Sequence, residues 1–196
     1  MCQTILCIVL LSLAATADAR VWRAATDGSG HTLTIQAAID SAASGDTVSI
    51  ANGTWTEPLK VRRKILTLRG DSQNGTVLDG FLDHRVLKIE QCVRVTVENL
   101  TVTAGLRNHT QYPETAGAGI AAFHSALTLR GITVRDNIGS LGLGAGVYSS
   151  VRELPGDLPP PGFQPGSPGL LVEDCLFQDN NAGDNGGHLF VEETEA

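Results

Sequence analysis

Apolar and polar residues alternate with a period of two along much of the chain, which predicts short β-strands with one buried face. The alternation is clearest in three segments that align residue by residue: 95–102 (VTVENLTV), 127–134 (LTLRGITV) and 170–177 (LLVEDCLF). In the first segment the phase shifts at Glu98-Asn99, which predicts a bend between two strands. An internal repeat of this kind indicates one supersecondary unit stacked on copies of itself.

The length of the repeat narrows the fold class. The two steps are 32 and 43 residues, and the longer one contains 152–169, which holds six of the chain's eight prolines. Without that Pro/Gly-rich loop insertion the step is 25 residues. A unit of about that length is too short for a propeller blade and suits one coil of a β-solenoid. We therefore expect an all-β parallel β-helix of about five coils.

Turn residues recur at fixed places in the repeat. The phrases at 117–120 (GAGI), 144–147 (GAGV) and 186–189 (GGHL) each precede an apolar strand, and glycine there permits positive φ and close backbone stacking. Asp136-Asn137 and Asp179-Asn180 occupy one repeat position. Because Asn and Asp tolerate left-handed turns, we expect these pairs to turn the chain, and the Asn side chains to stack as a ladder between coils.

One segment carries helical rather than strand periodicity. In 34–44 (TIQAAIDSAAS) the apolar residues follow i, i+3, i+4, i+7 spacing, with Thr34 as N-cap and Gly45 as the stop. We expect an α-helix that covers the open end of the first coil, where unpaired strand edges would otherwise promote aggregation.

The N-terminus has the features of a targeting segment. An apolar run of eleven residues, 5–15, is too short to span a bilayer, which takes roughly 20 residues. Ala17-Asp-Ala19 supplies a small-x-small cleavage pattern, although no Lys or Arg precedes the run. We interpret 1–19 as a secretory signal peptide rather than a membrane anchor, which leaves 20–196 as one secreted domain without a membrane span.

Net charge limits the partners. The chain has 14 Lys and Arg against 21 Asp and Glu, a net charge of −7, of which only Asp18 lies in the signal peptide. This balance argues against nucleic acid and anionic membranes, and it does not favour a polyanionic substrate. The local run 60–64 (KVRRK) is either a binding patch for an anion or a solvated coil edge.

Two cysteines, Cys92 and Cys175, remain after signal cleavage. A disulfide is permitted in an oxidising compartment. The repeat places the two on coils two steps apart, however, about 10 Å or more at the usual strand spacing, which exceeds disulfide geometry. We expect two free cysteines, and a buried apolar role for Cys175, because it aligns with Leu100 and Ile132.

Four Asn-x-Thr sequons predict N-glycosylation in a eukaryotic secreted protein. Asn52, Asn74 and Asn108 lie in expected turns, whereas Asn99 lies at a strand bend. The alternative is chance, because solenoid turns are rich in Asn, Gly and Thr.

Beyond these patterns, the chain resembles a known superfamily. The segments 34–40 (TIQAAID), 45–48 (GDTV) and 52–57 (NGTWTE) closely resemble the opening of right-handed parallel β-helix proteins of the pectate-lyase-like superfamily. The later glycine phrases, with 177–180 (FQDN), are similar to repeats of polymorphic outer-membrane proteins. The resemblance implies a right-handed coil. It leaves function open, since the superfamily includes lyases, hydrolases, esterases and passive stalks.

The end of the chain departs from that pattern. Members of the superfamily usually have more coils and a C-terminal cap, whereas this chain ends at 189–196 (LFVEETEA), within its last coil. We expect either a truncated product or an end protected by the acidic tail and a partner.

Candidate catalytic groups are scattered. A lyase would need carboxylates on Ca²⁺ and a basic residue, so Asp79, Asp83 and Arg85 beside the loop 107–115 are the test group. Asp136 with Asp179 is a candidate cation pair, with turn capping as the alternative. Asp174 with Asp179 is a candidate hydrolase pair.

Two further residues, His188 and Trp55, also bear on function, together with the sequence phrases typical of known β-helix enzymes. His188 in the third glycine phrase is expected to be structural. Trp55, near Glu57, is either a sugar platform or packs beneath the first loop. The phrases typical of pectin methylesterases and polygalacturonases are absent, and 51–56 (ANGTWT) is similar only to the start of alginate and chondroitin lyases.

Two functional hypotheses remain. The first is a secreted, non-catalytic β-helix module for binding or surface structure, without a cofactor, whose partner is a polysaccharide or cell-surface glycan. The second is a carbohydrate-active enzyme, a polysaccharide lyase or glycoside hydrolase, or an inactive remnant of one; only the lyase would use Ca²⁺. The loops 107–115 and 152–169 are the expected places for function, because solenoids extend binding elements from their coils.

Overall fold

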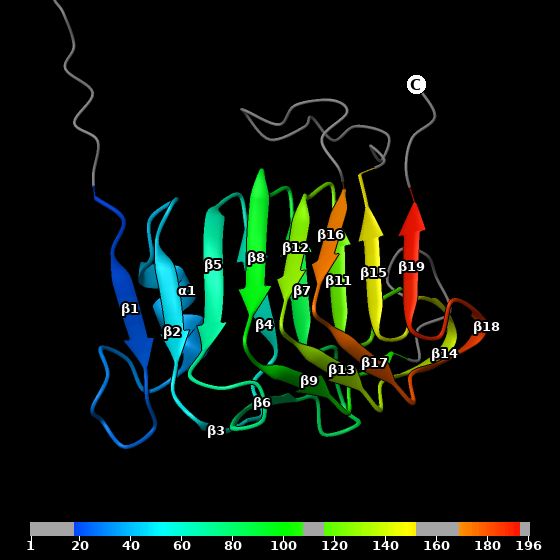
Figure 1. The fold of residues 1–196 in the computed structure, drawn as a ribbon, viewed down its shortest axis with the longest axis horizontal. Helices are drawn as coiled ribbons and strands as arrows, with labels where there is room; N and C mark the ends of the chain where they lie inside the picture. Colours follow the sequence, from blue (N-terminus) through cyan, green and yellow to red (C-terminus); the bar gives the residue numbers. More distant parts are fainter. Residues whose placement is uncertain (1–17, 108–115, 152–168, 193–196) are drawn as a thin grey trace, which may run out of the picture.

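The chain winds into five coils of a parallel β-helix (Figure 1). The computed structural model describes residues 18–107, 116–151 and 169–192. In Figure 1 the coils advance from left to right, with downward strands in front and upward strands behind, so the winding is right-handed. Parallel crossovers almost always have this hand, because strand twist favours it. The expected fold class and coil number are confirmed.

Each coil contributes one strand to each of three long sheets. Sheet A contains β1 (Val21–Ala24), β2 (Thr47–Ile50), β5 (Ile65–Gly70), β8 (Arg94–Glu98), β12 (Leu127–Arg130) and β16 (Leu170–Glu173). Sheet B contains β3 (Gly53–Trp55), β6 (Thr76–Asp79), β9 (Thr101–Thr103), β13 (Thr133–Arg135) and β17 (Leu176–Gln178). Sheet C contains β4 (Leu59–Arg62), β7 (Leu87–Glu90), β11 (Ile120–Phe123), β15 (Val147–Ser150) and β19 (Leu189–Glu192).

Two elements were not expected from the sequence. The last three coils add sheet D, formed by β10 (Leu106–Arg107), β14 (Ile138–Leu143) and β18 (Asn181–Asn185). Strand β1 precedes the first complete coil and pairs with β2. Neither segment shows a long alternating pattern, which is why periodicity alone does not reveal it.

The registers confirm the repeat alignment. Val95 pairs with Leu127, and Leu127 with Leu170, so the three aligned segments stack residue on residue. The predicted bend is also present, because Asn99, with φ of 56°, separates β8 from β9. Gly131 and Asp174 make the same left-handed bend in the next two coils, with φ of 54° and 51°.

The expected asparagine ladder runs through the corner between sheets B and D. Asn137 Oδ1 accepts from the Gly105 backbone N–H at 2.8 Å, and Asn137 Nδ2 donates to Asn180 Oδ1 at 2.8 Å. Asn180 Nδ2 donates in turn to the Val134 carbonyl at 2.8 Å. Both Asn side chains are buried, so the ladder satisfies backbone groups that water does not reach.

The glycine phrases begin with a left-handed residue, as expected. Gly117, Gly144 and Gly186 have φ of 61°, 62° and 62°. A Cβ atom at Gly144 would lie 2.2 Å from the Val147 carbonyl oxygen, and one at Gly117 would lie 2.4 Å from that of Ile120. Both conformation and space therefore require glycine at this corner.

The N-terminal end is closed by helix α1 (Ile35–Ser41), whose Ile35, Ala38 and Ile39 are buried. Thr34 is the N-cap, as predicted, and its Oγ1 accepts from the Ala37 N–H at 3.2 Å. The helix is shorter than the predicted 34–44. Ala42 is already extended, because the next residue, Ala43, donates its N–H to the Asp46 carboxylate at 2.8 Å.

Charged side chains hold both ends of α1 against the first coil. Glu57 accepts from the backbone N–H groups of Ile35 and Gln36 at 2.7 and 3.0 Å. Lys64 Nζ donates to the Ile39 and Ala42 carbonyls at 2.6 and 2.7 Å. A negative charge stabilises the partial positive charge at a helix N-terminus, and a positive charge stabilises the partial negative charge at the C-terminus.

Within the described residues, the fifth coil packs against the fourth coil but has no following coil to cover its other side. Val172 and Val191, which continue inward-facing rows, are 37% and 40% exposed. The expectation that Cys175 is buried was wrong: it is half-buried, whereas Leu100 and Ile132 at the same repeat position are covered by following coils.

Candidate functional site

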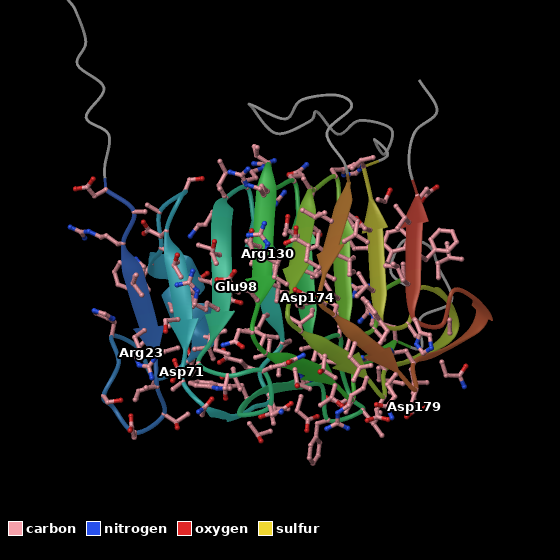
Figure 2. All side chains as sticks on the ribbon, viewed as in Figure 1. Arg23, Asp71, Glu98, Arg130, Asp174 and Asp179 are labelled. Atoms are coloured by element: carbon pink, nitrogen blue, oxygen red, sulfur yellow. The ribbon has the colours of Figure 1, made fainter. Side chains whose placement is uncertain are left out.

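The outer face of sheet A carries charges that neutralise one another. One outward row runs from Arg23 on β1 through Arg69, Glu98 and Arg130 to Glu173 on β16, and it contains the ion pairs Arg69–Glu98 and Arg130–Glu173. Arg23 pairs with Asp71 through two hydrogen bonds of 2.8 and 2.6 Å (Figure 2). Alternating, solvated pairs of this kind leave little net field for a charged ligand.

The outer face of sheet C has a different character. Basic side chains are concentrated in its first two coils, and aromatic side chains occur only in the later ones. One row contains Lys60, Lys88, Ala121, Tyr148 and Phe190, and the other contains Arg62, Glu90, Phe123, Ser150 and Glu192.

The basic part of this face encloses a hollow of about 240 Å³, which we call the basic hollow. It is lined by Pro58, Leu59, Lys60, His84, Arg85, Lys88 and Arg107. Glu90 lies beside it and pairs with Lys60 at 2.7 Å and with Lys88 at 2.8 Å. Burial alone would raise the pKa of Glu90, but the hydrogen bonds from the two lysines hold it below its ordinary value. Lys60 and Lys88 therefore share one ionised carboxylate, and Arg85 and Arg107 line the same hollow.

Arg85 forms a rigid wall of the basic hollow. Its Nε donates to the Gly117 carbonyl at 2.8 Å and its Nη2 donates to the Ala116 carbonyl at 2.7 Å. The guanidinium carbon also lies 5.6 Å from the Phe123 ring centroid, and Lys88 Nζ lies 5.7 Å from it. These cation–π contacts join the basic part of the face to the aromatic part.

The aromatic part is a stack across the last three coils. The Phe123 and Tyr148 ring centroids are 5.3 Å apart, and those of Tyr148 and Phe190 are 6.0 Å apart. Tyr148 is fully buried, and its hydroxyl donates to Glu192 at 2.6 Å. Tyr148 therefore supports the face rather than presenting a free ring to a ligand.

A second hollow, of about 590 Å³, adjoins the first and shares His84 with it. We call it the Phe81 hollow, and it is lined by Thr56, Phe81, Leu82, Asp83 and His84. The His84 Nε2 atom is buried and has no hydrogen-bond partner among the described residues. His84 lines both hollows, so the two lie next to each other on either side of this residue.

Among the described residues, the test group of candidate catalytic residues is divided between a turn and the two hollows. Asp79 accepts from the Phe81 N–H at 2.8 Å and so caps a turn, while Arg85 holds backbone carbonyls. Asp83 reaches the Phe81 hollow, where it lies 3.8 Å from His84 Nδ1. Of the predicted loop, Arg107 lines the basic hollow, and 108–115 lie outside the described residues.

The residues of both aspartate pairs occupy turns or bends, which the turn-capping alternative expected for Asp136 and Asp179. Asp136 and Asp179 have φ of 56° and 51°, and Asp174 has φ of 51° at the sheet A–B bend. Asp174 and Asp179 lie at different corners of the fifth coil (Figure 2). Within 18–107, 116–151 and 169–192, no three His, Cys, Asp or Glu residues group as a metal site would require.

The remaining candidates have structural contacts. Trp55 is buried in the core and donates to the Ala51 carbonyl at 3.1 Å, in agreement with packing beneath the first loop. His188 Nδ1 lies 3.3 Å from the ladder residue Asn180, in keeping with the expected structural role. The run 60–64 is divided: Lys64 holds α1, while Lys60 lines the basic hollow.

Cys92 and Cys175 are both free, as predicted. Among the sequons, Asn52, Asn74 and Asn99 are all exposed. Asn99 uses its Nδ2, the atom that would carry a glycan, to donate to the Gly70 carbonyl at 2.9 Å. Asn108 and most of the insertion 152–169 lie outside the described residues.

Sequence reasoning missed the basic hollow. The available signal was that Lys60 and Lys88 both occupy the second position of an apolar-flanked strand, so that stacking the first two coils brings them together. The contributions of His84 and Arg85 carried no such signal, because both lie in an irregular connection between β6 and β7.

Comparison with known proteins adds little. No protein-family model matches the chain, and no curated protein matches it. Among solved structures, the chain is similar to a pectin methylesterase in complex with a hexasaccharide, at 19% sequence identity and a TM-score of 0.43. The match covers 70% of this chain and 50% of that one, so the chain spans about half the length of this neighbour. Within the described part of the chain, no helix is long and apolar enough to cross a membrane.

Proposed function

We propose that the chain is a secreted, non-catalytic β-helix module that binds an acidic polysaccharide or cell-surface glycan on the outer face of sheet C. The observation that carries the proposal is the basic hollow, because four basic side chains, Lys60, Arg85, Lys88 and Arg107, line one depression on this face. Glu90 pairs with two of them, Lys60 and Lys88. The overall negative charge of the chain makes this local concentration of cations selective, because an anionic chain is repelled elsewhere.

The chemistry of Glu90 supports binding rather than hydrolysis. A glycosidase needs a carboxylic acid with a raised pKa facing a second carboxylate across the sugar. The pKa of Glu90 is lowered, because its two lysine partners outweigh its burial. A carboxylate held ionised between two lysines positions their ammonium groups and does not supply a proton.

Secretion and glycosylation belong to the same proposal. The apolar run followed by Ala17-Asp-Ala19 supports cleavage of 1–19. Exposure of Asn52 and Asn74 supports glycan attachment there, and Asn108 shares the sequon. Expression in eukaryotic secretory cells, followed by enzymatic deglycosylation and mass spectrometry, should show glycans at these three sites and none at Asn99.

Calorimetric titration tests the binding site. We expect acidic oligosaccharides to bind the wild-type protein with an affinity that falls as salt rises, and neutral oligosaccharides to bind more weakly. Replacing Lys60 and Lys88 by Met should weaken acidic binding about tenfold, or about 1.4 kcal/mol. The matched control is Arg69→Met with Arg130→Met, which removes the same charge from two ion-paired side chains on sheet A. Equal losses in both double variants would contradict the proposed location.

A lyase assay tests the enzymatic alternative. The purified protein is incubated with pectate, alginate and chondroitin, with and without Ca²⁺, and the ultraviolet absorbance of unsaturated product is followed. We expect no increase. A polymer-dependent increase that requires the protein would replace the binding proposal by a lyase.

A further inference from the structure

The connection between β6 and β7 presents two apolar side chains to solvent in an unfavourable backbone conformation. Phe81 and Leu82 are 75% and 51% exposed. Their φ angles are 52° and 50°, a region that bulky side chains rarely adopt. Such strain persists only where the surroundings determine it, and it is concentrated at functional sites.

Hydrogen bonds lock this connection onto the neighbouring coil. The Phe81 N–H donates to Asp79 Oδ1 at 2.8 Å, and the Leu82 N–H donates to the Ala104 carbonyl at 2.7 Å. The Gly80 N–H donates to the Thr103 carbonyl at 2.9 Å. The backbone that carries Phe81 is therefore held in place by the fold, so little backbone ordering is needed when a ligand binds.

The surroundings of Phe81 combine one aromatic ring with several hydrogen-bonding groups. Thr56, Asp83 and His84 line the same hollow of about 590 Å³. Its volume lies in the range of small-molecule sites. The His84 side chain is 22% exposed and its Nδ1 lies 3.8 Å from Asp83 Oδ2, so the imidazole borders this hollow beside the carboxylate.

We propose that Phe81 is a stacking platform for an uncharged sugar ring, one unit along the chain from an acidic sugar bound in the basic hollow. The C–H groups on one face of a pyranose carry partial positive charge and suit the negative face of the Phe81 ring. Its hydroxyl groups match the Thr56 hydroxyl, the Asp83 carboxylate and the His84 imidazole. The inference rests on the proposed function and assigns its ligand class: a polysaccharide in which uncharged and acidic units are neighbours.

Polar groups within the hollow favour a sugar over a lipid surface. A membrane contact would place Phe81 and Leu82 among acyl chains and would leave Asp83, which is 86% exposed as a side chain, facing the same apolar phase. A charged group in that position is unfavourable. A hydrated sugar accommodates both the ring and the carboxylate.

Phe81→Asn is the decisive variant, because Asn tolerates the left-handed conformation and removes the ring. Phe81→Trp keeps a platform and is the matched control at the same left-handed position. The probes are an alternating uronic acid–N-acetylhexosamine hexasaccharide, an all-acidic oligogalacturonate and a neutral cello-oligosaccharide. Affinity is measured by calorimetry, and ring contact is detected as upfield NMR shifts of sugar C–H protons.

We expect Phe81→Asn to weaken binding of the alternating oligosaccharide about tenfold and to abolish the upfield shifts, while Phe81→Trp retains both. Binding of the oligogalacturonate should change less than threefold. If the Lys60 and Lys88 double variant loses binding while Phe81→Asn does not, the platform is refuted and the proposed function stands. If the wild-type protein binds none of the acidic probes, the proposed function itself fails. Sedimentation of the wild type, but not Phe81→Asn, with phosphatidylcholine vesicles would overturn the sugar assignment.

Discussion

Replacing Asn137 by Ala should destabilise the β-helix far more than its size suggests. The side chain is fully buried and makes three hydrogen bonds of 2.8–2.9 Å: from the Gly105 N–H, to the Arg135 carbonyl and to Asn180 Oδ1. Each lost bond costs about 1 kcal/mol, and a buried group left unpaired costs roughly 1–3 kcal/mol. We therefore expect a loss of about 3–5 kcal/mol in the free energy of unfolding.

Urea denaturation followed by circular dichroism measures this loss of free energy. In a thermal melt, the Tm should fall by about 2–4 °C for each kcal/mol lost in a domain of this size. Asn181→Ala is the matched control, because the Asn181 side chain is exposed and accepts a hydrogen bond from the Gly183 N–H at 3.1 Å; it should change stability by about 0.5 kcal/mol or less. If both variants lose less than about 1 kcal/mol, the ladder does not stabilise the coils as argued here.

Three further predictions concern the N-terminal cap and the thiols. Glu57→Ala and Lys64→Met should each cost about 1–3 kcal/mol in urea denaturation, because each removes charged hydrogen bonds from one end of α1; an unchanged midpoint would show that the helix needs no clamp. Burial alone would raise the pKa of Asp46, but its N–H donors hold it below the ordinary value, so its contribution is present above about pH 4 and lost as the pH falls through the folded-state pKa. Asp46→Asn should therefore lower stability at pH 7 and flatten its acid dependence, and an unaltered acid limb would contradict this. Burial raises the pKa of both thiols, but Cys92 is fully buried and Cys175 only half-buried, so a thiol reagent should label Cys175 first; equal labelling rates would argue against the buried position of Cys92.

Much of the fold could be predicted, because a solenoid repeats the same physical requirements in each coil. The alignment of Val95, Leu127 and Leu170 became a strand register, since a buried inward row must be apolar in every coil. The recurring Asn137 and Asn180 became a ladder, because buried turn backbone needs side-chain partners. Departures arose where repetition ends, as at half-buried Cys175 in the last coil.

The candidate site was harder to predict, because its residues meet across coils and arise from different contexts. Lys60 belongs to a run of five that divides between two tasks, and only the register reveals that it lies beside Lys88. Arg85 was singled out as a catalytic candidate, yet its burial against two backbone carbonyls depends on a glycine turn in the next coil. Glu57 drew attention only as a neighbour of Trp55, because its role requires knowing where α1 begins.

Mapping a bound acidic oligosaccharide by amide NMR shifts tests most directly whether the outer face of sheet C is the binding face. We expect saturable shifts concentrated on β4, β7 and the connection from Phe81 to Arg85, which weaken with added salt and disappear in the Lys60→Met, Lys88→Met double variant. Shifts that instead follow Arg69 and Arg130 on sheet A, or no saturable shifts at low salt, would contradict the proposed glycan-binding site.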